Sequence, residues 1–252
     1  MKLLNNPSHF VLRKIKILSK NIQSPETAYN IWAENYDNEQ NNLMLFYDNI
    51  IVQQLIYKIN LKEKVILDYG CGTGRNWNSI LKFNPAKIIG CDISGEMLKK
   101  LKSKFVDAEV HVNKGNKLPF LLDKQVDIIM STLVMAHIKN IKKTFAEWIR
   151  VLNNTGTIII TDFHPELLAA GGSRTFNHNN KTITIQNYIH SIKEIESLLS
   201  SFGFGTLKLI EKKIDADVKH FYAINNALPV YDKFNGIPFI YGMMLSRQNA
   251  DK

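Results

Sequence analysis

The sequence is short of cysteine, of long apolar runs and, near its start, of acidic residues. Its 252 residues include two cysteines, Cys71 and Cys91, which are too few for a disulfide framework or a four-thiolate zinc site. No stretch approaches the roughly 18 apolar residues that span a bilayer. No acid precedes Glu26, as in a transit peptide, but residues 5–7 interrupt the apolar start and arginine is scarce. We therefore expect an N-terminal helical extension rather than a transit or signal peptide. These absences predict a cytoplasmic protein with no membrane span and no metal site.

Acidic residues are outnumbered throughout the chain, which leaves a formal net charge of +9. A positive surface favours anionic partners, RNA among them. The lysines are scattered, however, and the sequence has no dense basic run beyond pairs such as Lys142-Lys143. A solvated lysine surface is therefore the simpler interpretation. The oligomeric state stays open.

The order of apolar and polar residues predicts an N-terminal helical extension over residues 1–60, divided by a turn near 36–39, and an α/β domain over 61–252. The predicted strands cover residues 64–69, 87–92, 109–113, 126–131, 157–163, 206–214 and 238–245. The predicted helices cover residues 73–81, 94–104, 138–152 and 192–202. Short buried strands that alternate with helices are typical of βαβ units. We therefore expect a Rossmann-like, doubly wound and mostly parallel seven-stranded sheet.

Residues 164–190 interrupt this alternation after the fifth strand. They contain Gly171-Gly172, a polar run at 177–181 and a predicted extra strand at 182–188. We interpret the segment as an insertion that covers the acceptor, with the polar run as a solvated loop.

A glycine loop follows the first predicted strand, at residues 70–74. Glycine accepts positive φ and lets a ligand approach the main chain, and the next helix offers N–H groups to a carboxylate. The dinucleotide spacing G-x-G-x-x-G fails, because its third position falls on Arg75 or Trp77. Asp68 adds a carboxylate that repels a pyrophosphate and suits a cationic ligand. A tight turn without a ligand is the alternative.

The second strand ends in Asp92, which lies 24 residues after Asp68 (92 − 68). An acid at this point accepts the hydroxyl groups of a ribose. Any adenosine cofactor needs that contact, so Asp92 alone does not indicate which adenosine cofactor the protein binds. Its alternative role is to cap the following helix.

Several segments together resemble the class I S-adenosylmethionine (SAM) dependent methyltransferase superfamily over about residues 29–163. Residues 68–74 resemble its first motif, and 90–94 with Met97 and Leu98 its second. Residues 115–120 resemble the segment that meets adenine, with Asn116 where Asp is usual. Residues 32–37 resemble a segment that often closes over the cofactor. Residues 127–138 resemble the fourth motif, and residues 148–156 resemble the helix and turn before the fifth strand.

The resemblance implies SAM as the cofactor. The glycine loop would hold its methionine part, Asp92 the ribose, and Asn116 with Leu118 the adenine edge. Tyr36 would close the site, although an aromatic residue there is equally explained by core packing. The candidate cofactor-binding residues are Tyr36, Asp68, Gly70, Cys71, Gly72, Gly74, Asp92, Ile93, Met97, Asn116, Lys117, Leu118, Ser131 and Leu133.

Histidines near strand ends are the candidate catalytic groups, because a pKa near 6.5 suits proton transfer at neutral pH. His137 follows the fourth strand and His164 the fifth; capping or packing is the alternative for each. Cytosine C5 transfer is disfavoured because both cysteines lie in cofactor motifs. Residues 131–134 also lack the Asn/Asp-Pro-Pro-aromatic signature of nucleic-acid adenine methylation.

The leading hypothesis is a SAM-dependent methyltransferase that acts on an oxygen or nitrogen atom of a small molecule. A tRNA-modifying methyltransferase and a catalytically silent SAM-binding protein are the alternatives.

Overall fold

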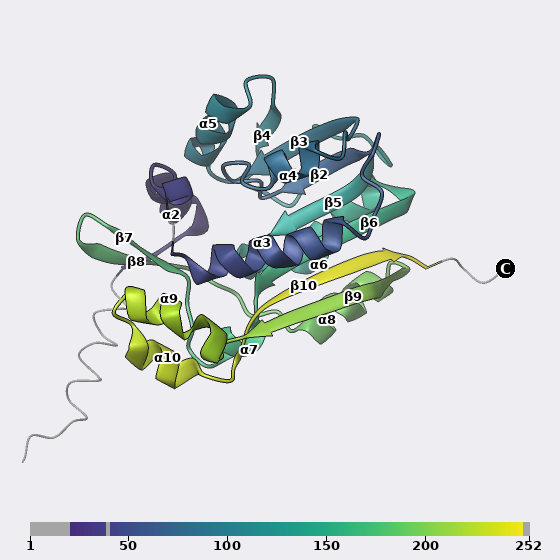
Figure 1. Ribbon diagram of the computed structural model, residues 1–252. Coiled ribbons are helices and arrows are strands. Elements are labelled where there is room, and N and C mark those ends of the chain that lie inside the picture. The colour runs from purple at the N-terminus through teal and green to yellow at the C-terminus, as the bar shows by residue number, and fades with distance from the viewer. Residues whose placement is uncertain (1–20, 39–40, 249–252) are drawn as a thin grey trace, which may run out of the picture.

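A computed structural model describes residues 21–38 and 41–248 (Figure 1). A seven-stranded sheet forms the centre of the molecule, and all its neighbouring strands are parallel except that β10 runs antiparallel to both β6 and β9. In spatial order the strands are β4 (Glu109–Val112), β3 (Lys87–Asp92), β2 (Val65–Tyr69), β5 (Val126–Thr132), β6 (Leu152–Phe163), β10 (Pro238–Arg247) and β9 (Phe204–Lys213). The predicted doubly wound, mostly parallel seven-stranded sheet is confirmed.

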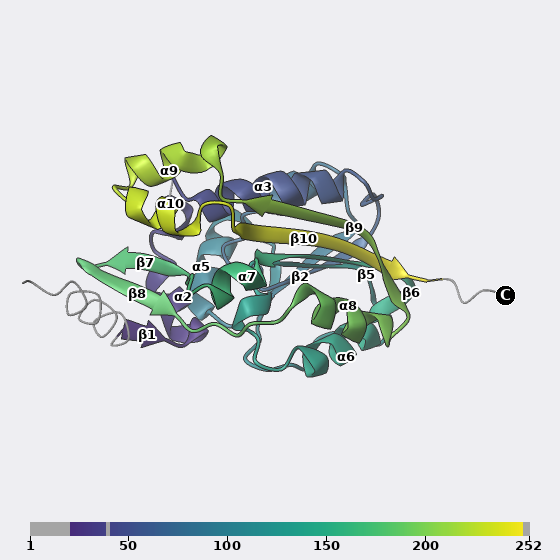
Figure 2. The ribbon, with the colours of Figure 1, turned by 90° about the horizontal axis from the view of Figure 1, so that it is seen from below.

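Helices cover both faces of this sheet, as Figure 2 shows from below. One face carries α3 (Leu43–Ile56), α4 (Trp77–Leu81) and α5 (Gly95–Lys104); the other carries α6 (Ile141–Val151) and α8 (Ile192–Ser200). Ile51 and Leu55 of α3 are fully buried on the first face, and Phe145 and Trp148 of α6 on the second. None of the helices that the structure describes is long and apolar enough to cross a membrane.

A small second layer lies beyond the carboxyl ends of the strands, and we call it the cover. It combines β1 (Ile22–Gln23), α2 (Pro25–Trp32) and the 3₁₀ turn η2 (Tyr36–Asn38) with a hairpin of β7 (Thr175–His178) and β8 (Lys181–Ile185). β1 pairs in parallel with β8, so chain segments about 160 residues apart share one sheet. The Trp32 and Phe176 rings stack with centroids 4.6 Å apart and planes 4° apart. The cover therefore joins the N-terminal segment to the insertion.

The predicted N-terminal extension divides into two parts in the structure. Its first 20 residues, and with them the basic start of the chain, lie outside the described residues. α2 joins the cover, whereas α3 packs against β6 and β10 of the central sheet. Ser24 caps α2 by accepting from the backbone N–H of Thr27 at 3.2 Å, and Pro25 occupies the first turn.

The predicted helix at 73–81 begins later, at Trp77. Gly72 and Gly74 have φ angles of +53° and +74°, which belong to the left-handed region and exclude a right-handed helix there. The predicted helix at 138–152 begins at Ile141, where the Asn140 side chain accepts from the Lys143 N–H at 3.1 Å. Backbone conformation thus decides the first boundary, and a side-chain cap decides the second.

The polar run at 177–181, interpreted as a solvated loop, forms a hairpin instead. Asn179 and Asn180 both have positive φ, 48° and 59°, which is the geometry of a tight turn between antiparallel strands. β8 ends at Ile185, three residues before the predicted end of the extra strand. Elements without a sequence prediction are β1, β7, α7 (Pro165–Ala169), η3 (Met135–His137), η4 (Ala216–Val218), α9 (Lys219–Ile224) and α10 (Leu228–Phe234).

Candidate active site

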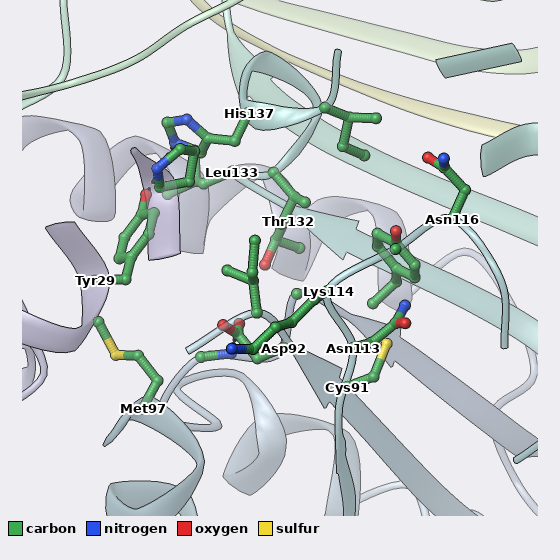
Figure 3. Close-up of a pocket in the computed structure, with 18 of the residues that line it drawn as sticks. Tyr29, Cys91, Asp92, Met97, Asn113, Lys114, Asn116, Thr132, Leu133 and His137 are labelled. Atoms are coloured by element: carbon green, nitrogen blue, oxygen red, sulfur yellow. Dashed lines mark hydrogen bonds between the residues drawn. The ribbon is translucent and has the colours of Figure 1, made fainter. Parts of the chain in front are cut away.

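A cavity of about 230 Å³ opens at the carboxyl ends of β2, β3 and β5, under α2 of the cover (Figure 3). Parallel α/β sheets bind ligands at this edge, where the strand order reverses. Its lining residues are Pro25, Tyr29, Tyr36, Tyr69, Gly70, Gly72, Cys91, Asp92, Ile93, Met97, Asn113, Lys114, Gly115, Asn116, Thr132, Leu133, Val134, His137, Ile138 and Lys139. Tyr29, His137 and Met97 lie on one side, Asn113 and Asn116 on the other, with Asp92 between them.

The glycine loop forms the floor of this cavity. The Gly70 N–H donates to the Cys91 carbonyl at 2.7 Å, and the Gly74 N–H donates to the Cys71 carbonyl at 2.9 Å. A Cβ on Gly72 would meet no atom within 4 Å, although Gly72 has a positive φ. The loop therefore leaves open space against bare main chain, which suits a ligand that approaches the backbone closely.

Asp92 lies at the centre of the cavity wall. Its Oδ2 accepts from the Gly72 N–H and its Oδ1 from the Ser94 N–H, both at 2.8 Å. Burial raises the pKa of Asp92, and these backbone donors oppose the rise. Each carboxylate oxygen keeps acceptor capacity after these bonds, so the side chain can also accept from two adjacent ligand hydroxyl groups.

Tyr29 and His137 face one another on the cover side of the cavity (Figure 3). His137 Nδ1 lies 3.1 Å from the Gln186 carbonyl, which accepts only, so Nδ1 carries the proton. Nε2 therefore accepts from the Tyr29 hydroxyl at 3.0 Å. Burial and the charge of Arg174 lower the pKa of His137 to about 3. The imidazole is thus neutral at physiological pH and engaged at both nitrogens.

The opposite side of the cavity offers amide groups. Asn113 Nδ2 is buried and has no hydrogen-bond partner within residues 21–38 and 41–248. Asn116 Oδ1 accepts from the Thr144 hydroxyl at 2.9 Å. A buried donor without a partner is costly unless a ligand or water supplies an acceptor. Asn113, the open space at Gly72 and the Asp92 carboxylate together fit an adenosine-containing cofactor.

The sequence-predicted residues divide by their relation to this cavity. Tyr36, Gly70, Gly72, Asp92, Ile93, Met97, Asn116, Leu133 and His137 line it. Asp68, Cys71, Gly74, Lys117, Leu118, Ser131 and His164 do not line it. The structure thus brings nine of the predicted residues into one cavity and leaves the others around it.

Asp68 and Gly74 support the loop from behind. Asp68 Oδ2 accepts from Trp77 Nε1 at 2.8 Å, and burial raises the pKa of Asp68 to about 7. A Cβ on Gly74 would lie 3.0 Å from the Leu101 side chain, so Gly74 faces α5. Cys71 is buried.

The other predicted residues that do not line the cavity are exposed, buried or hydrogen-bonded elsewhere. Lys117 is exposed, and the Leu118 N–H donates to Glu147 Oε1 at 2.8 Å. Ser131 is buried, and its hydroxyl has no partner in the described part of the chain. His164 caps α7 by accepting from the Glu166 N–H, and its Nε2 donates to Glu211 Oε1 at 2.8 Å.

The polar lining residues that sequence reasoning missed are Tyr29, Tyr69, Asn113, Lys114, Thr132 and Lys139. Asn113 directly follows β4, and its place after a parallel strand was a usable signal. Tyr29 gave no such signal, because an aromatic residue within a helix usually packs in a core. Its position depends on the contact between α2 and the hairpin.

A second and larger cavity, of about 820 Å³, lies between the cover, α7 and the pair α9 and α10. Its lining combines aromatic and aliphatic side chains with about as much polar surface, which comes from amides, hydroxyl groups and one arginine. The residues are Trp32, Asn38, Asn41, Asn42, Leu43, Met44, Phe163, Leu167, Gly172, Ser173, Arg174, Thr175, Phe176, Asn177, Thr182, Ile214, Phe221, Tyr222, Asn225, Ala227, Val230, Phe234 and Phe239.

Arg174 connects the walls of the two cavities. It lines the second cavity, and its guanidinium donates to the Tyr36 hydroxyl at 3.2 Å and to the Leu133 carbonyl at 3.3 Å. Tyr36 and Leu133 both line the first cavity. The two cavities are therefore neighbours that meet at this arginine.

Comparisons with known proteins agree with this geometry. A family model described as a methyltransferase domain matches residues 67–160. The chain is 27% identical over 233 residues to an uncharacterised methyltransferase of Emericella nidulans, covering 76% of this chain and 81% of that protein. It is 29% identical over 158 residues to a malonyl-[acyl-carrier protein] O-methyltransferase of Hamiltonella defensa, covering 62% and 58%.

Solved structures share the fold. A SAM-dependent methyltransferase of Mesorhizobium loti superposes with a TM-score of 0.57 at 15% identity, covering 77% of this chain and 96% of that one. A doubly wound sheet with a glycine loop and an acid at its switch point is typical of proteins that bind a nucleotide-type cofactor. The methyltransferase-domain match narrows that class. Residues 67–160 thus form a methyltransferase domain with the class I fold, and the chain is a SAM-dependent methyltransferase.

Proposed function

We propose that this methyltransferase acts on an oxygen or nitrogen atom of a small molecule bound in the second cavity. The observation that carries the proposal is the contact of the two cavities at Arg174. A volume of about 820 Å³ is within the range of small-ligand sites, and the lining offers both aromatic side chains and hydrogen-bonding groups to a ligand. The name of the Hamiltonella relative supports an oxygen acceptor.

The cofactor would occupy the first cavity along its whole length. Gly70 and Gly72 would contact its methionine part, and Asp92 would accept from its ribose hydroxyls. Asn113 and Asn116 would bind the adenine edge, since a buried amide donor without a partner suits a ring nitrogen. When bound, SAM supplies a methyl group activated on a positively charged sulfur.

The chain itself contributes orientation and exclusion of water. α2 lies over the first cavity and is held to the hairpin by the Trp32–Phe176 stack. Tyr29 is fixed by its hydrogen bond to His137, whose other nitrogen is fixed by the Gln186 carbonyl. Alignment of two bound reactants is enough for a large part of a rate enhancement. We assign His137 to hold Tyr29 in place, because an imidazole with a pKa near 3 is a weak base.

Calorimetry with SAM and incubation with methyl-labelled SAM test this proposal. We expect SAM to bind a folded sample with micromolar affinity, and label to appear in the small-molecule fraction of a cell extract. Absence of SAM binding would exclude the cofactor site. SAM binding without label transfer to any fraction would support the silent binding protein instead.

The tRNA alternative is favoured by the net charge of +9. It requires label in the RNA fraction and an affinity that falls steeply with salt, because phosphate contacts release counterions. Transfer to a small acceptor that is insensitive to salt between about 50 and 200 mM contradicts it.

A further inference from the structure

Arg174 is a buried cation without a carboxylate partner. It is 4% exposed, and no ion pair of its guanidinium occurs within residues 21–38 and 41–248. The inward-facing Arg75 and Arg150 each pair with an acid, Asp48 and Glu147 respectively. A buried guanidinium is normally paired in this way, since burying a charge alone is unfavourable.

Neutral groups are what hold Arg174 in place. Besides Tyr36 and Leu133, its guanidinium carbon lies 5.5 Å from the centre of the Tyr29 ring and 5.4 Å from that of Trp32. Asp162 is the nearby acid, but its oxygens accept from the Ala136 and Phe163 N–H groups, both at 2.6 Å.

The protonation of Arg174 is set by these neighbours. Burial lowers the pKa of Arg174, but Tyr29, Tyr36 and Asp162 raise it further, and the net result lies above its ordinary value. The side chain therefore carries a full positive charge at the edge of the second cavity.

The second cavity matches an apolar anion. Among its described lining residues Arg174 alone is charged, and none is Asp, Glu, His or Lys. Phe163, Phe176, Phe234 and Phe239 form an apolar part of its wall, and the other polar lining side chains are uncharged amides and hydroxyl groups. Charge complementarity thus selects a ligand with an apolar body and one negative group at the Arg174 end.

The position of the arginine places that negative group beside the cofactor cavity. Tyr36 and Leu133, which bind the guanidinium, form the wall of that cavity. A group paired with Arg174 therefore lies at the boundary where the reacting atoms must meet. At the same boundary His137 has both nitrogens engaged and offers no free base.

We propose that the acceptor is a carboxylic acid with an apolar body, and that Arg174 binds its carboxylate for O-methylation. The inference rests on the proposed function. A carboxylate is already deprotonated at neutral pH, so it needs no general base. One C–O bond forms, the bond between methyl and sulfonium sulfur breaks, and its electron pair stays on sulfur. The products are a methyl ester and the neutral sulfide, and no proton is released.

Base lability of the product tests the chemical class. Small-molecule fractions that take up label from methyl-labelled SAM are treated with mild alkali, which hydrolyses methyl esters and spares methyl ethers and methylamines. We expect most of the label to become volatile methanol. Label that stays non-volatile overturns this inference but leaves small-molecule methylation intact, whereas absence of SAM binding overturns the proposed function itself.

Binding measurements test the role of Arg174 independently of turnover. The probes are straight-chain carboxylates from hexanoate to dodecanoate and 4-phenylbutanoate, each compared with its neutral amide by calorimetry in the presence of S-adenosylhomocysteine. We expect at least one carboxylate to bind the wild-type protein tenfold or more tightly than its amide. That ratio should fall to about one in Arg174→Gln and to an intermediate value in Arg174→Lys, which keeps the charge and loses the planar fork.

The ratio of the two affinities separates charge recognition from damage to the cavity, because both ligands meet the same altered pocket. Arg247→Gln is the matched control: this half-buried arginine lies over the Phe204 ring at the end of β10 and lines neither cavity. It should keep the wild-type ratio. Equal binding of carboxylates and amides to the wild type, a preference that survives in Arg174→Gln, or no binding by any carboxylate overturns the assignment.

Discussion

Gly70 and Gly72 share a left-handed backbone but differ in their surroundings. A Cβ on Gly70 would lie 2.2 Å from Val134 Cγ2, whereas one on Gly72 would meet nothing within 4 Å. We expect Gly70→Ala to lower the free energy of unfolding by about 2–4 kcal/mol, from backbone strain and overpacking together. Gly72→Ala should cost roughly 1–2 kcal/mol from strain alone.

Urea denaturation of both variants checks this contrast. Adding Val134→Ala to Gly70→Ala should recover part of the loss, because the clash is with that side chain. Equal losses for the two glycine variants, with no recovery in the double variant, would contradict the packing argument.

Asp92 accepts from two backbone N–H groups, and an amide accepts through one oxygen only. Asp92→Asn should therefore leave the Gly72 or the Ser94 N–H without its acceptor, at a cost of about 1–3 kcal/mol. We also expect the dissociation constant for SAM to rise at least tenfold in calorimetry. Glu96→Gln, on the exposed start of α5, is the control and should bind like the wild type. An unchanged SAM affinity for Asp92→Asn would remove Asp92 from the proposed site.

Asp68 makes the free energy of unfolding depend on pH. Burial raises its pKa in the folded protein to about 7, against an ordinary value near 4. Between about pH 4 and pH 7 the folded state holds a proton that the unfolded chain releases, so the free energy of unfolding falls as the pH rises.

Asp68→Asn removes this ionisation and keeps an oxygen that accepts from Trp77 Nε1. Its decline in stability between pH 4 and pH 7 should be clearly shallower than that of the wild type, by denaturation at a series of pH values. Asp123→Asn, at an exposed side chain paired with Arg150, should keep the wild-type decline. If stability depends on pH identically in Asp68→Asn and the wild type, the raised pKa of Asp68 is refuted.

Among the elements, the hairpin of β7 and β8 packs against α2, which is far from it in the sequence. Phe176 stacks on Trp32 of α2, and α2 carries Tyr29 into the cofactor cavity. Phe176→Ala should lower stability by about 3–5 kcal/mol and weaken SAM binding at least tenfold, because α2 loses its support. Leu199→Ala in α8 removes a fully buried side chain from the core on the opposite face of the sheet. It should destabilise comparably and leave SAM affinity within about twofold, which distinguishes local support from global stability.

The helices and strands differ in how well the sequence predicts them. The sequence predicts a strand at 87–92 and a helix at 94–104. β3 and α5 match them because the apolar pattern is a local signal and Ser94 caps α5 locally. It predicts neither α9 nor α10, since they are short and acquire their stability from packing on the rim of the second cavity. It also misses β7, because the turn residues Asn179 and Asn180 are typical of a polar loop.

For the whole molecule, the cover is the part that SAM binding should affect most. It is held together by a two-residue pairing of β1 with β8 and by a small core around Trp32 that is separate from the cores of the central sheet. Ligand binding stabilises the folded state by about 2.7 kcal/mol at a hundredfold excess over the dissociation constant. Hydrogen exchange should therefore slow on SAM addition in α2 and β8, by at least tenfold in rate. The core strands β5 and β6 should change little, and uniform protection across the chain would argue against a separate cover.

The sequence alone determined the sheet, the cofactor loop and the class of reaction. Buried strands, capping residues and glycine spacing act over a few neighbouring residues, so local pattern is enough to identify Gly70, Gly72 and Asp92. The tertiary structure decided which side chains share a cavity. Arg174 lies 41 residues from Leu133 and 138 from Tyr36, and only folding brings the three together. The proposed acceptor site depends on such long-range contacts, which the local sequence pattern does not reveal.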